Sequence, residues 1–203
     1  MWKLNMHVIS VDIAYSARSG IIGLAEAIDG DLVGMWSLQA PVMPRSAQER
    51  LQRLWAITPN AERVLVVERP YSGRSVGAGM GLVEAMAVWS TCAELLGACV
   101  LRPLASQWRA RGSRGGCRAL ATWMRDTGRA RPGRGGARAA WKALAVAFVR
   151  EGYALDMSDH EAEAVVMALW GEEQAQGQLA STVEAAWSAL QRTFAAPNAR
   201  EDA

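Results

Sequence analysis

The chain has 203 residues, 51% of them hydrophobic, which is enough for one domain with a substantial buried core and excludes a disordered chain. The net charge of +2 conceals an uneven distribution, because residues 102–150 carry eleven Arg and one Lys against a single acid, Asp126, whereas nineteen acids face ten bases in the rest. Such a basic segment favours contact with a polyanion. Three cysteines without metal-ligand spacing, no long apolar run and no secretion signal predict a cytoplasmic protein without a membrane span.

Three apolar, β-branched stretches at the start of the chain predict three strands. These span residues 7–14, 20–27 and 31–38. Between the second and the third, Asp29 and Gly30 favour a tight hairpin because both residue types tolerate positive φ, so these strands should be antiparallel. Ser46 and Glu49 then form a capping-box pattern that predicts a helix over residues 46–57.

The remaining elements alternate between strand and helix and end in helices. Short apolar stretches predict strands at residues 63–68 and 98–102. Helices are predicted at residues 80–96 and 139–150, from Ser158 to about Gly171, and at residues 182–194. The apolar stripe of the first of these helices consists of Leu82, Met86, Trp89, Ala93 and Leu96. This order of elements predicts a mixed α/β layer fold.

Two acids stand at strand positions where a carboxylate is costly. Asp12 lies inside an otherwise apolar strand, and burying an unpaired carboxylate there costs roughly several kcal/mol. Glu68 ends the apolar run VLVVE in the same way. A bound cation would compensate the negative charges of both carboxylates. The alternatives are that each carboxylate pairs with a basic side chain or is exposed to solvent at the end of its strand.

A third element with candidate ligands is the segment SDHEAEAVVMALW, whose Ser158 and Glu161 form a second capping box. His160 and Glu163 are three residues apart and therefore share one face of the first helical turn, where free N–H groups favour anions. Asp159 and Glu161 there merely complement the helix dipole. Carboxylates from strand ends and a helix start are the ligands that Mg²⁺ prefers, and two metal ions about 4 Å apart can drive phosphodiester hydrolysis.

The order of the segments VDIAYSARSG, VVERPYSG and DHEAEAVVMALW resembles the RuvC family of Holliday junction resolvases, particularly its phage-type members, over about residues 7–171. The resemblance implies a ribonuclease H-like α/β fold with a central five-stranded mixed sheet flanked by helices. It also implies that Asp12, Glu68, His160 and Glu163 are the catalytic residues and hold two Mg²⁺ or Mn²⁺ ions.

The sequence departs from the family pattern at three places. The first strand reads VDIAYS where many members have a Gly-rich turn directly after Asp. Glu163 stands where Asp is usual, which moves the carboxylate one methylene further out. His160 occupies a position that is often Asp, and a nitrogen ligand suits manganese better than a site made of carboxylates alone. We therefore expect activity with Mn²⁺ at least equal to that with Mg²⁺.

The resemblance and the basic segment together predict contacts with branched DNA. The predicted DNA-binding residues are Tyr71, Arg74, Arg109, Arg111, Arg114, Arg118, Arg138 and Lys142. Tyr71 stands where relatives carry an aromatic residue that can wedge into a junction. A loop rich in Arg and Gly without defined contacts is the alternative for the basic segment. The resemblance further implies a homodimer through the helix near residues 80–96.

The predicted organisation is a RuvC-like nuclease domain at residues 1–180, with a basic DNA-binding segment at 102–142, and a C-terminal helix and polar tail at 181–203. The predicted function is an endonuclease that resolves four-way junctions by paired symmetric nicks leaving 5′-phosphate ends. Three alternatives stay open. They are a less selective nuclease for branched or flapped DNA, a non-catalytic junction-binding protein, and a sugar-kinase or actin-like ATPase, although that last class needs a longer chain.

Overall fold

The computed structural model describes residues 5–13, 20–40, 42–70, 76–109, 116–132 and 138–195. Four of the predicted DNA-binding residues lie outside these ranges, namely Tyr71, Arg74, Arg111 and Arg114. Among the residues that the structure describes, no helix combines the length and the apolar character needed to cross a membrane.

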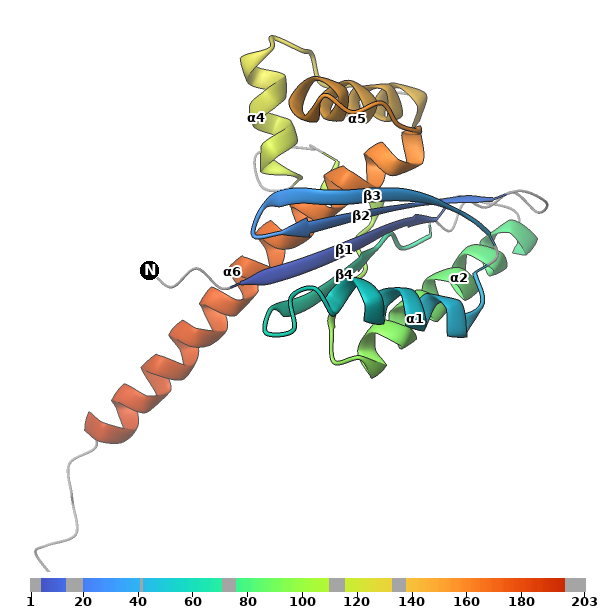
Figure 1. Ribbon diagram of the computed structural model, residues 1–203. Coiled ribbons are helices and arrows are strands. Elements are labelled where there is room, and N and C mark those ends of the chain that lie inside the picture. The colour runs from blue at the N-terminus through green and yellow to red at the C-terminus, as the bar shows by residue number, and fades with distance from the viewer. Residues whose placement is uncertain are drawn as a thin grey trace, which may run out of the picture.

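A mixed sheet of five strands forms the centre of the molecule (Figure 1). Its order is β3-β2-β1-β4-β5, and its strands are β1 (Met6–Ile13), β2 (Ile21–Ile28), β3 (Asp31–Gln39), β4 (Glu62–Val67) and β5 (Cys99–Leu101). The first three strands are antiparallel, whereas β4 runs parallel to β1 and β5 runs parallel to β4. Asp29 and Gly30 turn the β2–β3 hairpin with φ of 52° and 93°, as predicted. The predicted fold class is confirmed.

Helices cover both faces of this sheet. On one face lie α1 (Pro44–Trp55) and α2 (Val76–Leu95), and on the other the long helix α6 (Asp159–Ala195) crosses β1 and β2 (Figure 1). The helices α4 (Arg118–Asp126) and α5 (Arg138–Tyr153) pack against α6, and the short helix α3 (Ala105–Trp108) also contacts it. The C-terminal half of α6 projects away from the body of the molecule.

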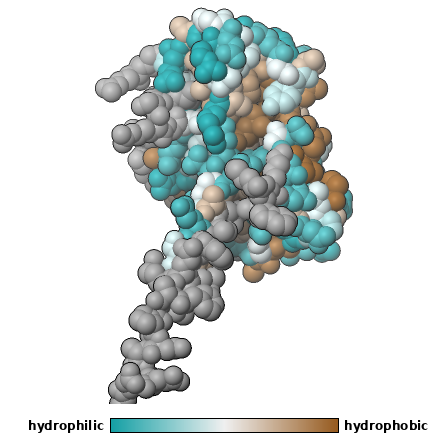
Figure 2. Space-filling model, turned by 90° about the vertical axis from the view of Figure 1, so that its left-hand side faces the viewer, coloured by the Kyte–Doolittle hydropathy of each residue, from teal (hydrophilic) through white to brown (hydrophobic). Residues whose placement is uncertain are grey.

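The alternation of side chains along β1 divides the core into two layers. Met6 and Val8 face α6, whereas Ile9 and Val11 face α1 and α2. The buried face of α2 is the predicted apolar stripe, with Leu82 and Trp89 in this second layer. On the outside, Figure 2 shows one face on which hydrophobic side chains gather to one side of a largely hydrophilic body.

Several predicted helix boundaries differ from the observed ones. Helix α2, predicted to begin at residue 80, begins at Val76. Helix α1 begins at Pro44 and not at Ser46, because Pro is favoured at the first helical positions, where its missing N–H is not needed. Glu49 therefore makes no capping box and instead accepts a hydrogen bond of 2.9 Å from Arg45.

The two helices predicted after Ser158 are a single helix, α6. Its Gly171 does not end the helix, because the missing side chain lets the helix lie directly on Val66 of β4; a Cβ there would stand 2.2 Å from Val66 Cγ2. Residue 180, the predicted end of the nuclease domain, lies inside this helix, and the division of the chain at that point stays a prediction.

Candidate active site

Asp12 reaches the site because of its register on β1. It points to the same side of the sheet as Met6, Val8 and Ser10, toward α6, and its side chain is buried. The Ser10 hydroxyl donates a 2.5 Å hydrogen bond to the Ala164 carbonyl of α6, which attaches the helix to this strand. The strand therefore delivers a carboxylate to the first turns of α6.

His160 and Glu163 are placed by the start of α6. The predicted capping box is present, because Ser158 N–H donates to Glu161 Oε2 at 2.8 Å and Glu161 N–H donates to Ser158 Oγ at 3.3 Å. The helix can approach the sheet closely here because Gly23, the partner of Asp12 on β2, has no side chain. A Cβ at Gly23 would stand 2.2 Å from the His160 carbonyl oxygen.

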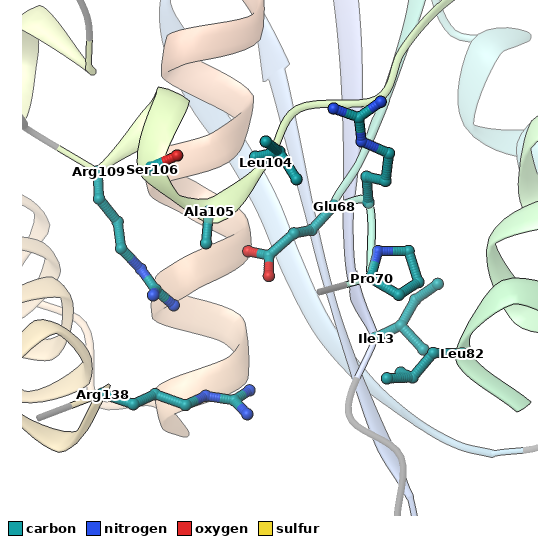
Figure 3. Close-up of a pocket in the computed structure, with 10 residues that line it drawn as sticks. Ile13, Glu68, Pro70, Leu82, Leu104, Ala105, Ser106, Arg109 and Arg138 are labelled. Atoms are coloured by element: carbon teal, nitrogen blue, oxygen red, sulfur yellow. The ribbon is translucent and has the colours of Figure 1, made fainter. Parts of the chain in front are cut away.

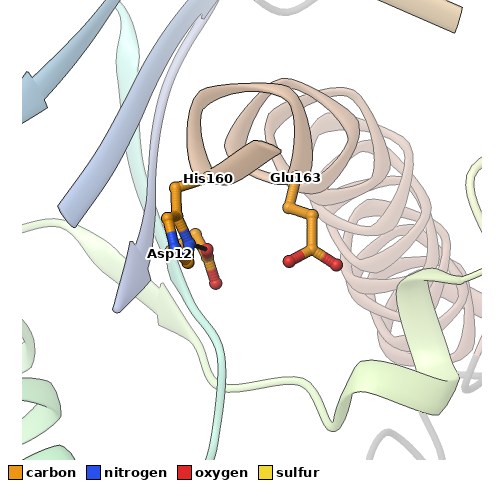
Figure 4. A group of neighbouring side chains, drawn as sticks. All are labelled: Asp12, His160 and Glu163. Atoms are coloured by element: carbon orange, nitrogen blue, oxygen red, sulfur yellow. Dashed lines mark hydrogen bonds and ion pairs between the residues drawn. The ribbon is translucent and has the colours of Figure 1, made fainter. Parts of the chain in front are cut away.

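Asp12, His160 and Glu163 converge at this crossing (Figure 4). His160 Nδ1 lies 2.6 Å from Asp12 Oδ2, and one ligand atom from each of the three residues lies within 4.8 Å of the other two. The Glu163 side chain points into the same space from the next turn of the helix. Three of the four predicted metal ligands are thus brought together in one group.

Glu68, the fourth predicted ligand, follows the end of β4 and is held beside this group rather than within it. Its Oε2 accepts a 2.9 Å hydrogen bond from the indole N–H of Trp108, which is buried. Burial raises the pKa of Glu68 to about 7, and the negative charges of Asp12 and Glu163 raise it as well, against the opposing effect of Arg109. The carboxylates are therefore close enough to repel one another.

The cations beside these acids come from the basic segment, where Arg109 directly follows α3 and Lys142 lies on α5. Arg109 donates from Nη2 to Glu163 Oε1 at 2.7 Å. Lys142 of α5 donates to Asp159 Oδ2 at 2.6 Å, and its Nζ lies 3.9 Å from Glu163 Oε2. Two of the predicted DNA-binding residues therefore contact acids of the site in the free protein.

The two other described members of that set lie further out. Arg138 is exposed at the start of α5 and lines a cavity of about 460 Å³ together with Glu68 and Arg109 (Figure 3). Arg118 begins α4, where its side chain is 79% exposed and lies 3.6 Å from Glu173 of α6. Arg138 thus faces Glu68 across the cavity, whereas Arg118 pairs with Glu173 away from the site.

The residues present fit a divalent metal ion. Three carboxylates and an imidazole are hard or borderline ligands of the kind that Mg²⁺ and Mn²⁺ accept. Burial raises the pKa of Glu163 and the charge of Asp12 raises it further, which Arg109 and Lys142 offset only in part. Within the described part of the chain, the buried Oε2 of Glu163 has no hydrogen-bond partner. A cation at this point would relieve both the repulsion and the unsatisfied oxygen.

The sequence did not predict how three residues position the site. Gly23 permits the close crossing, Trp108 orients Glu68, and Asp159 pairs with Lys142 although we expected it only to complement the helix dipole. A Gly inside an apolar strand is a recognised signal of close backbone approach, so Gly23 could have been found. Nothing in the sequence indicates the two other contacts, because their partners lie forty and seventeen residues away.

Known structures share this fold. The chain is similar to the structure of T. thermophilus RuvC in complex with Holliday junction substrate, with a TM-score of 0.55 and 15% identity over 84% of this chain and 95% of that one. The chain has a RuvC-like fold. A second Thermus thermophilus RuvC structure matches with a TM-score of 0.52 and 15% identity over 85% of this chain and 97% of the other. No protein-family model matches the sequence, and no curated protein matches it significantly.

Proposed function

We propose that this chain is a metal-dependent endonuclease that resolves four-way DNA junctions by paired symmetric nicks. The observation that carries the proposal is the group of buried Asp12, half-buried His160 and buried Glu163, with Glu68 beside it, at the sheet–helix crossing of a RuvC-like fold. A buried cluster of acids is costly unless a cation compensates it. The printed description of one similar structure includes a Holliday junction substrate, which supports the choice of DNA.

In this proposal Asp12, Glu68, His160 and Glu163 hold two Mg²⁺ or Mn²⁺ ions. Bound there, the metal ions supply an activated water and stabilise the charge that develops in an in-line displacement at phosphorus. The buried positions of Asp12 and Glu163 keep their carboxylates from bulk water, and the Trp108 indole orients Glu68. The product strands would carry 5′-phosphate ends.

The basic side chains around the acids supply the DNA contacts. Arg138 and Arg109 line the cavity beside Glu68, and Lys142 lies next to Glu163, so all three can reach a phosphate that enters there. Arg118 is exposed on α4. The remaining proposed contacts come from residues outside the described ranges, namely Tyr71, Arg74, Arg111 and Arg114. When the logarithm of the binding constant for duplex DNA is plotted against the logarithm of the salt concentration, each neutralised phosphate should make the slope steeper by about 0.9.

Symmetric nicking requires two active sites, and we propose that α2 joins two copies of the chain. Met80, Val83 and Leu95 of this helix are 59%, 50% and 74% exposed, so they are apolar side chains that a second copy could cover. Small residues of the same helix, such as the exposed Ala87, would allow close helix packing. The proposed domain comprises residues 1–180, with the DNA-binding segment at 102–142.

The test is cleavage of a synthetic four-way junction, with a linear duplex of equal sequence as the comparison substrate. The wild-type protein should make paired symmetric nicks in Mn²⁺ and none in chelator. Asp12→Asn should abolish cleavage and keep or raise junction affinity, because it removes a metal ligand and also a negative charge near phosphate. Asp126→Asn is the matched control, since this exposed acid pairs with Arg125 away from the site.

Each alternative has its own outcome in the same assay. Cutting of flaps and other branched DNA as fast as four-way junctions would favour a less selective nuclease. Tight junction binding without cutting in any metal would favour a non-catalytic binding protein. An Asp12→Asn variant that cuts at the wild-type rate would show that the proposed site is wrong.

A further inference from the structure

Two adjacent residues at the end of α3 hold two of the four proposed metal ligands. The indole N–H of Trp108 donates to Glu68, and the guanidinium of Arg109 donates to Glu163. The Arg109 guanidinium also lies over the Trp108 ring, with Cζ 4.7 Å from the ring centroid. Stacking on a buried indole fixes the direction in which Arg109 reaches the acids.

The Arg109–Glu163 pair is buried, with side-chain exposures of 14% and 1%. The two Glu163 oxygens are used differently. Oε1 accepts the 2.7 Å hydrogen bond, whereas Oε2 has no hydrogen-bond partner in the described part of the protein and only the Lys142 Nζ at 3.9 Å as a nearby cation. Glu163 is thus paired with the Arg109 guanidinium while it also offers a ligand atom within 4.8 Å of those of Asp12 and His160. A divalent ion in that space would bind the same carboxylate as the Arg109 guanidinium. The two positive charges would then be close together in a buried site and would repel each other strongly.

A second anion can bind the Arg109 guanidinium in place of Glu163. Arg109 lines the cavity of about 460 Å³ together with Arg138 and Ser106, and Figure 3 shows both guanidinium groups directed toward the open space beside Glu68. The planar fork of Arg matches phosphate as well as carboxylate. A phosphate diester in this cavity would thus offer Arg109 an alternative partner close to Glu163.

Resting on the proposed function, we infer that Arg109 is an exchangeable counter-ion that couples metal loading to DNA. In the free protein it neutralises Glu163 and weakens metal binding to the group of Asp12, His160 and Glu163. When DNA enters, Arg109 transfers to the phosphate and leaves Glu163 free for metal. Arg109 is a positioning residue, because in the free protein it affects metal binding only through its ion pair with Glu163.

The experiment is a calorimetric titration of Mn²⁺ into the full-length protein without DNA. Arg109→Gln should bind Mn²⁺ at least tenfold more tightly than the wild type, because the competing charge is gone. Arg109→Lys keeps the charge and should stay within threefold of the wild type. Arg129→Gln is the matched control and should show no change, because Arg129 pairs with the exposed Glu151 far along α5. A purely structural role for Arg109 would instead weaken metal binding in the Gln variant.

A second measurement uses the wild type and needs no variant to fold. Mn²⁺ affinity should rise at least tenfold when a four-way junction with non-hydrolysable linkages is present, and by linkage Mn²⁺ should raise junction affinity by the same factor. No rise would overturn the inference, as would Mn²⁺ affinity in Arg109→Gln that is unchanged or weaker. If the wild type and Asp12→Asn bind Mn²⁺ equally poorly even with DNA, it is the proposed metal site itself that fails.

Discussion

Replacing Gly23 by alanine adds one methyl group where α6 crosses β2, and the structure predicts its effect in some detail. The new Cβ would stand 2.2 Å from the carbonyl oxygen of His160, 2.3 Å from its carbonyl carbon and 2.7 Å from the Glu161 nitrogen. All three are backbone atoms, so no side chain can rotate away. To restore an ordinary contact of 3.4 Å, the start of α6 must move by about 1 Å away from Gly23.

Two consequences follow from that displacement. Overpacking of this kind costs about 1–3 kcal/mol, and each kcal/mol lowers the Tm of a chain of this size by about 2–4 °C. The second consequence is specific to the site, because His160 and Glu163 move with the helix start while Asp12 stays on β1. A misplacement of about 1 Å can cost roughly a hundredfold in activity. Because two of the three ligand residues move relative to the third, we also expect Gly23→Ala to lose at least tenfold in Mn²⁺ affinity.

The assay is calorimetric Mn²⁺ binding combined with thermal unfolding, and α6 itself offers two controls. Gly171→Ala also meets an atom at 2.2 Å, Val66 Cγ2, but two turns beyond the site, so it should lower the Tm and leave Mn²⁺ affinity unchanged. Gly177→Ala meets nothing within 4 Å and should raise stability by up to about 1 kcal/mol. If Gly23→Ala binds Mn²⁺ as the wild type does, the close crossing does not position the site and the reasoning is refuted.

Two further predictions concern protons and metal identity. The pKa of Glu68 is raised from 4.5 to about 7, so the folded metal-free protein holds the Glu68 proton more tightly than the unfolded chain does. The contribution of Glu68 to the free energy of unfolding should therefore be complete below pH 4.5 and be lost as the pH rises through 7. Mn²⁺ affinity should rise over the same pH interval, because the proton and the metal compete for Glu68. Glu68→Gln should make both the free energy of unfolding and the Mn²⁺ affinity less dependent on pH, which unfolding and binding measurements would show. His160→Asp should raise the ratio of cleavage in Mg²⁺ to cleavage in Mn²⁺, since it replaces a nitrogen ligand with oxygen. An unchanged ratio would mean that His160 is not a ligand.

Local patterns predicted much of the fold. The apolar strand around Asp12, the hairpin at Asp29 and Gly30, and the capping box at Ser158 each depend on residues a few positions apart, and the structure contains all three. The five strands occur along the chain where the apolar stretches predicted them, and the mixed sheet that they form was implied by the family resemblance. Such short-range signals are strong because the chemistry of a turn or a cap is complete within four residues.

What the sequence did not predict depends on contacts between distant segments. Helix α6 continues through Gly171 because packing on β4 compensates the low helix propensity of glycine. Helix α4 forms within a segment that composition describes only as rich in Arg and Gly, and Glu173 of α6 accepts hydrogen bonds from the Arg118 N–H at its start. The pairing of Arg109 with Glu163 likewise joins residues 54 positions apart. None of these follows from periodicity or composition.

The central claim is that buried acids and one histidine hold divalent metal, and anomalous diffraction from crystals soaked in Mn²⁺ tests it most directly. The account predicts an anomalous peak coordinated by Asp12, His160 and Glu163, and with DNA bound a second peak about 4 Å away that is coordinated by Asp12 and Glu68. Both peaks should vanish in Asp12→Asn. Manganese bound only elsewhere on the surface, or a peak at the site that persists unchanged in Asp12→Asn, would contradict the account.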